Sequence, residues 1–308
     1  MSGIDLTIVI ECTTGEITGR CDGAANLAAW LAQARELSGR SEVVIAAPRP
    51  VLPPDGGAGG VEVRGLEVAG AGYYALKNAG AEAARGEIVL FTDIDCRPAP
   101  SYLVTLLEAF RDPGVACVAG RSFYDGEGLV TRLNTAHSFG DLHRQPGYVE
   151  RGLVLSHNVA VRRSALQAQP FGPYAGRIGG DRHFLDRVRA AGHRVLLVPG
   201  LVIHHEDISY NLRGTLERHL REHLLPVHYG TVGQRFSAAW TVASVLALRP
   251  LLRLKRVAQA GPRVGLGGRH WPAALLVNAG YWAFDLACVF AVLAVPRLRR
   301  RWLRFVYG

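Results

Sequence analysis

The sequence predicts an open α/β fold in which a mostly parallel sheet is flanked by helices. Apolar runs of strand length recur at residues 5–11, 41–48 and 87–93. Segments with helical spacing of apolar side chains lie between or after them, and glycine or proline ends most segments. Strands that are apolar on both faces are typical of a sheet covered by helices on both sides.

Each expected element has its own pattern in the sequence. Residues 5–11 are apolar and β-branched, as in a buried strand, and residues 26–39 space Leu27, Trp30 and Leu31 at helical intervals. Residues 41–48 repeat the strand pattern. The other expected elements are a Gly/Pro-rich loop at 48–60, strands at 61–68, 87–93, 115–124 and 194–205, and helices at 73–86, 100–112 and 179–193.

Charge and cysteine content exclude some classes of protein. The net charge is +9, but residues 236–308 hold ten arginines and Lys255 against Asp285, which leaves residues 1–235 near neutrality. A nucleic-acid-binding face needs basic side chains clustered on the folded part, so we expect no nucleic acid as partner. The five cysteines are scattered and form no CxxC, which fits a reducing cytosol better than a disulfide framework or a zinc site.

Two carboxylates, Asp93 and Asp95, stand where the strand at 87–93 ends. Ligands of open α/β sheets bind beyond the carboxyl ends of the strands. Mg²⁺ takes oxygen ligands there, typically one or two carboxylates together with substrate phosphates. The alternative is that both carboxylates only cap the helix expected to begin near Pro100.

Longer stretches around this pair resemble family-2 glycosyltransferases of the GT-A fold. "KNAGAEAARGEIVLFTDIDCRP" (77–98) matches that family's Asn-x-Gly helix, buried strand and Asp-x-Asp. "SHNVAVRRSAL" (156–166) is similar to its segment near the acceptor, and "GGDRHFLDRVRAAGHRVLLVPGLVIHH" (179–205) to its acidic helix start and histidine ending. The resemblance covers about residues 5–230. It implies a Rossmann-like GT-A fold and inverting transfer of a sugar from a nucleotide-diphosphate donor to an acceptor hydroxyl.

The resemblance also implies a metal and a base. Asp95 would bind Mg²⁺ or Mn²⁺ between the donor phosphates, with His204 as a further ligand and His205 as its substitute. Asp181 would be the general base that deprotonates the acceptor hydroxyl, a role that needs a carboxylate in a partly desolvated cleft. The structural alternatives are that Asp181 is only a helix N-cap and that the histidines only satisfy a strand end.

Other residues are implied in substrate binding. Asp93 would face the ribose or base of the nucleotide, and Lys77 and Asn78 would contact nucleotide or phosphate. The alternative for Lys77 is that it is a solvated helix residue. Glu11 would offer an acceptor to the base. The acceptor-side segment contains His157 and Asn158.

The chain departs from the family pattern at three places. "IECTTGE" (10–16) replaces the usual first strand end, Ala46 and Ala47 stand where the family has an acidic turn that grips the base, and Gly180 replaces a frequent glutamate. The alternative function is therefore a degenerate GT-A protein that binds a nucleotide sugar or a partner without turnover.

We expect two domains, a catalytic domain at 1–235 and a basic, hydrophobic helical tail at 236–308. Residues 271–295 are long enough to cross a bilayer core of about 30 Å, although Asp285 would cost about 3 kcal/mol there unless it is paired. The tail is expected at the cytoplasmic face of the cell membrane, as a peripheral, re-entrant or spanning segment. The alternative is a buried helical subdomain. Membrane association would suit a carbohydrate or lipid-linked acceptor of the cell envelope.

Overall fold

The computed structural model divides into two compact units. Unit 1 comprises Met1–Asp125 and Gln145–Glu206, and unit 2 comprises Gly126–Arg144 and Asp207–Gly308. The predicted domain boundary after residue 235 lies outside the described residues. The structure describes residues 5–13, 23–37, 41–50, 60–143, 147–148, 154–168, 171, 180–206 and 247–297.

Unit 1 is built on one nine-stranded sheet. Its strand order is β3-β2-β1-β4-β8-β6-β9-β5, and β7 pairs with β9 off this path. The strands are β1 (Leu6–Glu11), β2 (Ser41–Ala47), β3 (Glu62–Glu67), β4 (Ile88–Asp93), β5 (Cys96–Pro98), β6 (Val115–Tyr124), β7 (Gly147–Tyr148), β8 (Val159–Arg162) and β9 (Arg194–His205).

The sheet is mixed, which corrects the expectation of a mostly parallel one. β1 to β4 pair in parallel, and so do β6 and β9, but β8 runs antiparallel to both β4 and β6 and β5 runs antiparallel to β9. The sequence predicted none of β5, β7 and β8, because runs of two to four residues are too short for an apolar period to identify them. The six longer strands were predicted correctly.

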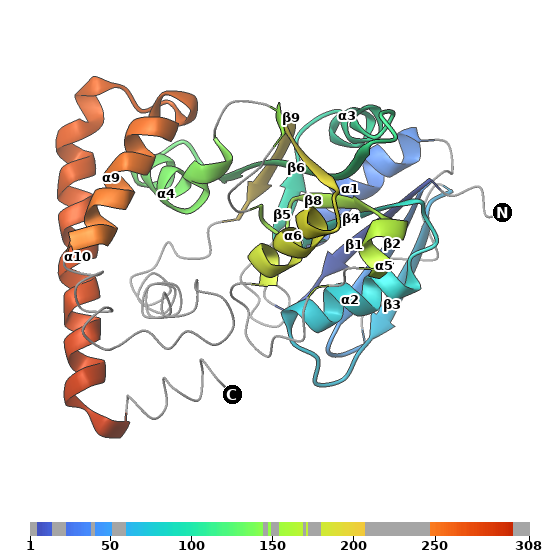
Figure 1. Ribbon diagram of the computed structural model, residues 1–308, viewed down its shortest axis with the longest axis horizontal. Coiled ribbons are helices and arrows are strands. Elements are labelled where there is room, and N and C mark those ends of the chain that lie inside the picture. The colour runs from blue at the N-terminus through green and yellow to red at the C-terminus, as the bar shows by residue number, and fades with distance from the viewer. Residues whose placement is uncertain are drawn as a thin grey trace. The chain divides into compact units, whose positions relative to one another are not determined.

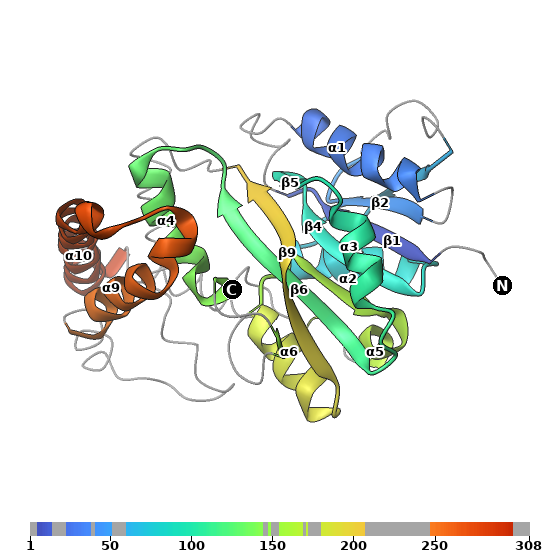
Figure 2. The same cartoon turned by 90° about the horizontal axis from the view of Figure 1, so that it is seen from above.

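Helices cover both faces of this sheet (Figures 1 and 2). On β1, Ile8 and Ile10 join the core that holds Trp30, whereas Val9 joins the core that holds Tyr74. This alternation is the two-residue period of a strand buried on both sides. The first core contains α1 (Gly23–Glu36) and α3 (Tyr102–Ala109); the second contains α2 (Tyr73–Ala83), α5 (Arg163–Ala168) and α6 (Gly180–Ala190).

Gly80 lets α2 approach β1 closely. A Cβ atom at this position would lie 2.3 Å from Val9 Cγ1, a separation that real side chains do not tolerate. A glycine inside a helix costs about 1 kcal/mol relative to alanine. The close contact between α2 and the sheet explains why glycine stands here.

Unit 2 contains three longer helices among its described residues. They are α4 (Leu129–Phe139), α9 (Arg249–Ala260) and α10 (Trp271–Ala294), with short 3₁₀ turns at Gly140–Leu142, Gly261–Val264 and Gly268–His270. Arg256 of α9 donates to the carbonyl of His137 at 3.0 Å and pairs with Asp141 at 3.1 Å. Tyr281 of α10 donates to Asn134 Oδ1, so side chains of both α9 and α10 bond to α4 or the turn that follows it.

Asp285, the charge that interrupts α10, is paired. Arg253 donates to its carboxylate at 2.5 Å, and Arg249 lies 3.9 Å away. Asp285 and Arg253 are both buried, which is tolerated only because each charge has a partner. Across the part of the chain that the structure describes, no helix combines the length and the apolar character needed to cross a membrane.

Candidate active site

The site lies at the carboxyl ends of the parallel strands of the unit 1 sheet. Glu11 and Asp93 are the last residues of β1 and β4 and stand opposite each other in register. Asp95 follows in the turn before β5, whose first residue, Cys96, pairs with His205 at the end of β9. Strand pairing thus gathers acids and an imidazole from distant parts of the sequence.

Two groups of side chains at these strand ends have the spacing of metal ligands. One group is Asp93, His157 and His205, and the other is Asp95, Cys96 and His205. Within each group the candidate ligand atoms all lie within 4.8 Å of one another. His205 belongs to both groups.

Hydrogen bonding prepares His205 as a ligand. Its Nδ1 lies 2.8 Å from the carbonyl oxygen of Glu206, and because a carbonyl only accepts, Nδ1 carries the proton. The lone pair is then on Nε2, 3.7 Å from Asp95 Oδ1. That separation is too long for a hydrogen bond. It suits two ligands of one cation, since atoms about 2.1 Å from a common ion lie at most about 4.2 Å apart.

His204 faces the other side of β9. Its ring stacks on Phe123 with centroids 6.2 Å apart, and it lies opposite Arg97 in the strand register. Burial and the neighbouring Arg97 lower the pKa of His204. Adjacent residues of a strand point in opposite directions, so the pair His204 and His205 cannot both reach Asp95.

The donor set fits a hard divalent cation. Asp93 and Asp95 supply carboxylate oxygens, and His157 and His205 supply imidazole nitrogens, a combination found around Mn²⁺ and related ions. Cys96 is a poor candidate ligand, because burial and the neighbouring Asp95 and Asp93 raise the pKa of its thiol well above the usual value. We therefore assign the candidate cation site to the two aspartates and the two histidines.

Asp93 is held by a buried ion pair. Lys77 Nζ lies 2.6 Å from Asp93 Oδ1 and also donates to the carbonyls of Thr92 and Ser156 at 3.1 and 3.0 Å. All three ammonium protons therefore have acceptors. Burial alone would raise the pKa of Asp93, but the ammonium charge of Lys77 and its hydrogen bond to the carboxylate lower it below its ordinary value. Asp93 is thus a fixed carboxylate.

Asp181 has the opposite electrostatic character. It is the second residue of α6, and it accepts a hydrogen bond from Tyr74 Oη at 2.9 Å and further ones from Ser156. Burial raises the pKa of Asp181 above its ordinary value, although the hydrogen bonds from Ser156 and Tyr74 and the charge of Lys77 oppose that rise. A carboxylate with a raised pKa is a stronger proton acceptor when ionised.

A short hydrogen-bonded chain connects Asp181 to Asp93. Tyr73 Oη donates to Asp93 Oδ2 at 2.9 Å and accepts from Ser156 Oγ at 3.0 Å, and the backbone N–H of Ser156 donates to Asp181. The proposed base and the candidate cation site therefore belong to one network. Burial and the nearby carboxylates raise the pKa of Tyr73, which keeps its phenol protonated as a donor.

Tyr74 explains the unusual Gly180. A Cβ atom at position 180 would lie 2.5 Å from the Tyr74 ring, so no larger residue fits while the ring keeps this position. The same ring carries the hydroxyl that donates to Asp181. Where the family often has glutamate, this chain instead has a tyrosine from α2 beside the aspartate.

The remaining predicted residues take the following places. Asn78 makes two hydrogen bonds with the backbone of Phe171, at 2.8 and 2.9 Å, so its amide joins α2 to that residue. Asn158 is buried; it accepts from Tyr102 Oη at 2.6 Å and donates to the Arg121 carbonyl. The side chain of Glu11 is fully buried beneath the strand edge.

Sequence reasoning overlooked Tyr73, Tyr74 and Ser156, and it assigned His157 to the acceptor side only. The one available signal was the Tyr-Tyr pair that opens the helix containing Lys77. Tyr73 lies four residues before Lys77, and Lys77 Nζ sits 4.7 Å from its ring centroid. Nothing in the sequence connects Ser156 with Asp181.

Comparisons with known proteins agree with this fold. Residues 58–169 match the model of the family described as Glycosyl transferase family 2. Glycosyltransferase AglE of Haloferax volcanii is 27% identical over 124 residues, 40% of either chain. The pre-mycofactocin glycosyltransferase of Mycobacterium tuberculosis is 34% identical over 102 residues, 30% of this chain and 22% of the relative. The matches thus span two fifths or less of these relatives.

Two solved structures share the architecture. The mannosyltransferase PcManGT from Pyrobaculum calidifontis aligns over 93% of this chain and 86% of its own, with TM-score 0.55 and 18% identity. TarS of S. aureus aligns over 93% of this chain and 54% of its own, with TM-score 0.51 and 12% identity. At these identities the likeness concerns the fold. Residues 58–169 are thus similar in sequence to the family-2 glycosyltransferases, and the chain as a whole shares its fold with these two solved structures.

Proposed function

We propose that unit 1 transfers a sugar from a nucleoside-diphosphate sugar to an acceptor hydroxyl, with inversion at the anomeric carbon. One observation carries this proposal: a cation-binding group of carboxylates and imidazoles shares a hydrogen-bonded network with a carboxylate whose pKa is raised. Charge stabilisation for a departing diphosphate and a base for the attacking hydroxyl are what this reaction needs.

The donor would bind at the edge formed by β1, β4 and β9. A divalent cation held by Asp93, Asp95, His157 and His205 would offset the negative charge of the diphosphate. Lys77 and Tyr73 keep Asp93 ionised and fixed in place, so that the ligands are arranged before the donor arrives. The PcManGT structure is described as a complex with GDP-Man and Mn²⁺, which supports a nucleotide-sugar donor and Mn²⁺ or Mg²⁺ here.

Asp181 would take the proton of the acceptor hydroxyl. The acceptor oxygen then forms a bond to the anomeric carbon as the bond from that carbon to the diphosphate breaks. The nucleoside diphosphate leaves with the electron pair. Because attack comes from the face opposite the leaving group, a single displacement inverts the anomeric configuration, and no covalent intermediate is needed.

The two adjacent histidines provide a matched test of the cation site. His205→Ala should weaken Mn²⁺ binding by more than about tenfold, because even outer partners of metal sites change affinity by that factor. His204→Ala should keep the affinity of the unmodified chain, since its ring faces Phe123. Isothermal titration calorimetry with Mn²⁺ measures the affinity of both variants. Equal losses of Mn²⁺ affinity in the two variants would contradict the assignment.

Hydrolysis of the donor by the unmodified chain would distinguish an enzyme from a protein that binds the donor without turnover.

Tyr74→Phe should shift the pH dependence of transfer. The Tyr74 hydroxyl stabilises the ionised form of Asp181, so its loss raises the already elevated pKa of that carboxyl further. A base acts only when ionised, and activity falls as the pH drops through its pKa. The acid limb of the rate profile should therefore move to higher pH in this variant. The rate profile should be measured from about pH 4.5 to 8. An acid limb at the same pH in both proteins would show that Asp181 is not the titrating base.

A further inference from the structure

Helix α10 of unit 2 has its polar and apolar faces reversed relative to an ordinary surface helix. Its exposed large side chains include Leu276 at 75%, Phe290 at 63% and Leu275 at 51% exposure. We call the set Trp271, Leu275, Leu276, Trp282 and Phe290 the apolar stripe. Among the side chains of α10 that the structure describes, every exposed one is apolar or a glycine. A helix in contact with water shows the opposite pattern.

The polar residues of α10 face inward instead. Asn278 donates to the Pro250 carbonyl at 3.3 Å, Tyr281 donates to Asn134, and Asp285 pairs with Arg253. These contacts give each of the three side chains a polar partner on the protein side of the helix. Polar residues of segments in an apolar medium are arranged in this way, because they pair with one another inside a bundle.

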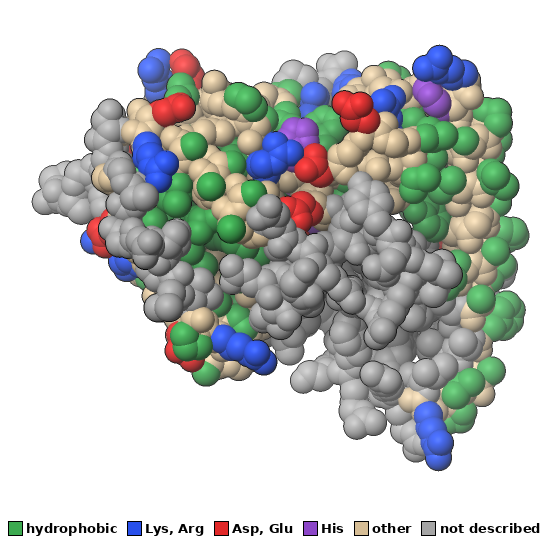
Figure 3. Space-filling model, turned by 180° about the vertical axis from the view of Figure 1, so that it is seen from behind, with side chains coloured by type: hydrophobic (Ala, Val, Ile, Leu, Met, Phe, Trp, Pro, Cys, Tyr) green, Lys and Arg blue, Asp and Glu red, His purple; other side chains and the backbone are tan. Residues whose placement is uncertain are grey.

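The space-filling view shows the outer face of this arrangement. Hydrophobic side chains form a continuous column along the right edge of Figure 3, where α10 lies, and Lys or Arg side chains appear near both ends of that column. Exposed basic residues of this region are Lys255, Arg263, Arg269 and Arg297. Within residues 247–297 the only acid is Asp285, which is buried in its ion pair. The exposed charged side chains that the structure describes within residues 247–297 are therefore all basic.

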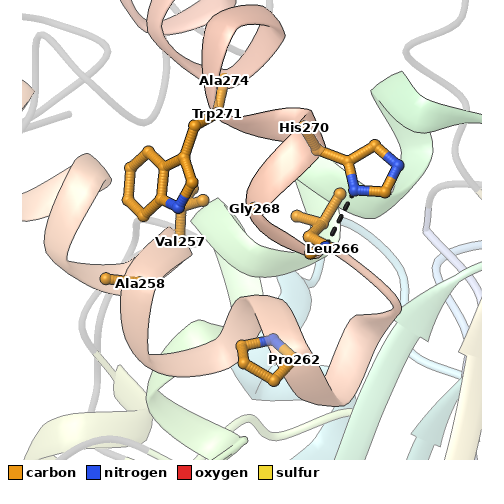
Figure 4. A pocket seen from close by; sticks show the side chains of 9 residues that line it. Val257, Ala258, Pro262, Leu266, Gly268, His270, Trp271 and Ala274 are labelled. Carbon is orange, nitrogen blue, oxygen red and sulfur yellow. Dashed lines mark hydrogen bonds between the residues drawn. The ribbon is translucent and has the colours of Figure 1, made fainter.

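A small pocket lies at the Trp271 end of the stripe. It has a volume of about 140 Å³ and is lined by Val257, Ala258, Pro262, Leu266 and Ala274 among others. Figure 4 shows the Trp271 and His270 side chains on two sides of it, with His270 Nδ1 accepting from the Gly267 backbone at 2.8 Å.

We propose that the apolar stripe and its basic ends bind the surface of an anionic lipid bilayer. An amphipathic helix of this kind lies in the interface, with apolar side chains among the acyl chains and arginines at the headgroups. Tryptophan is favoured at the same depth. A second copy of the chain fits less well, because symmetric pairing of the stripe would bring two basic rims together. The side of the membrane, predicted as cytoplasmic, stays a prediction.

Vesicle flotation of the full chain tests this proposal. The unmodified chain should float with vesicles that contain about one third phosphatidylglycerol, and less with phosphatidylcholine alone. The double variant Leu276→Glu with Phe290→Glu should reduce the bound fraction at least about tenfold, because two charged side chains would have to enter the acyl region. The matched control is Val104→Glu, which alters an apolar side chain of unit 1 that is 49% exposed and should float normally.

Three results would overturn the proposal. The first is that the unmodified chain does not float with the vesicles. The second is that the double variant floats as well as the unmodified chain. The third is that the unmodified chain sediments as a dimer, and that the double variant loses the dimer but still floats. If the double variant does not fold, tryptophan emission of the unmodified chain decides. Its blue shift on adding anionic vesicles should shrink in Trp282→Phe, and an undiminished shift would count against the stripe. None of these readouts depends on sugar transfer.

Discussion

Asp181→Asn is expected to lower the rate of sugar transfer by about 10²- to 10⁴-fold, the usual contribution of a general base. The amide keeps the size of the side chain but cannot take a proton from the acceptor hydroxyl. Donor and Mn²⁺ affinities should change little, because among the described residues the hydrogen bonds from Asp181 towards the cation site run through Ser156 and Tyr73. Single-turnover rates together with calorimetric donor binding would measure the two effects separately.

The same substitution should not reduce stability. A carboxyl whose pKa is raised on folding destabilises the folded chain once the pH exceeds its ordinary pKa, and Asp181 is of this kind. A neutral amide removes that cost, so the thermal midpoint near pH 7 should stay the same or rise. Asp186→Asn, on the same helix but exposed to solvent, is the matched control and should retain full activity. Full activity in Asp181→Asn would exclude this residue as the base.

Lys77→Met is expected to have the largest effect on folding, about 3–5 kcal/mol of lost stability. Lys77 is fully buried, and its ammonium group serves Asp93 and two backbone carbonyls. Methionine fills similar space but leaves the buried Asp93 carboxylate without its counter-charge. Urea denaturation at neutral pH would measure the free energy of unfolding.

A double variant separates charge from packing. Lys77→Met combined with Asp93→Asn removes both charges and should recover part of the lost stability, because no uncompensated buried charge remains. Lys255→Met, at the exposed lysine of α9, should alter stability by less than about 0.5 kcal/mol. If the single Lys77 variant were as stable as the unmodified chain, the ion pair would not be what fixes Asp93.

Local sequence patterns were sufficient for the framework of unit 1. The apolar strands at 5–11, 41–48 and 87–93 and the amphipathic helix at 179–193 correspond to β1, β2, β4 and α6 within a few residues. Their side chains follow a period of 2 or 3.6 residues whatever partner they pack on. The pair Asp93 and Asp95 could likewise be placed at a strand end from neighbouring residues alone.

Contacts between distant segments were needed for the site. Which of His204 and His205 faces Asp95 depends on the register of β9 against β5, and a shift of one residue would exchange them. Ser156 meets Asp181, and Tyr74 occupies the space beside Gly180, only because α2, α6 and the segment before β8 converge. The periodic pattern of a sequence does not specify contacts between residues that are far apart in it.

In the tail, too, the sequence predicted some features and tertiary packing determined the others. Its composition alone identified a long apolar stretch with basic surroundings and one unexplained acid, Asp285. Only the packing of α10 against α9 determined that this acid pairs with Arg253 and that the apolar side chains face outward. Sequence determines periodicity and charge because these depend on neighbours along the chain. Tertiary structure determines which face is covered, because burial depends on what lies across from it.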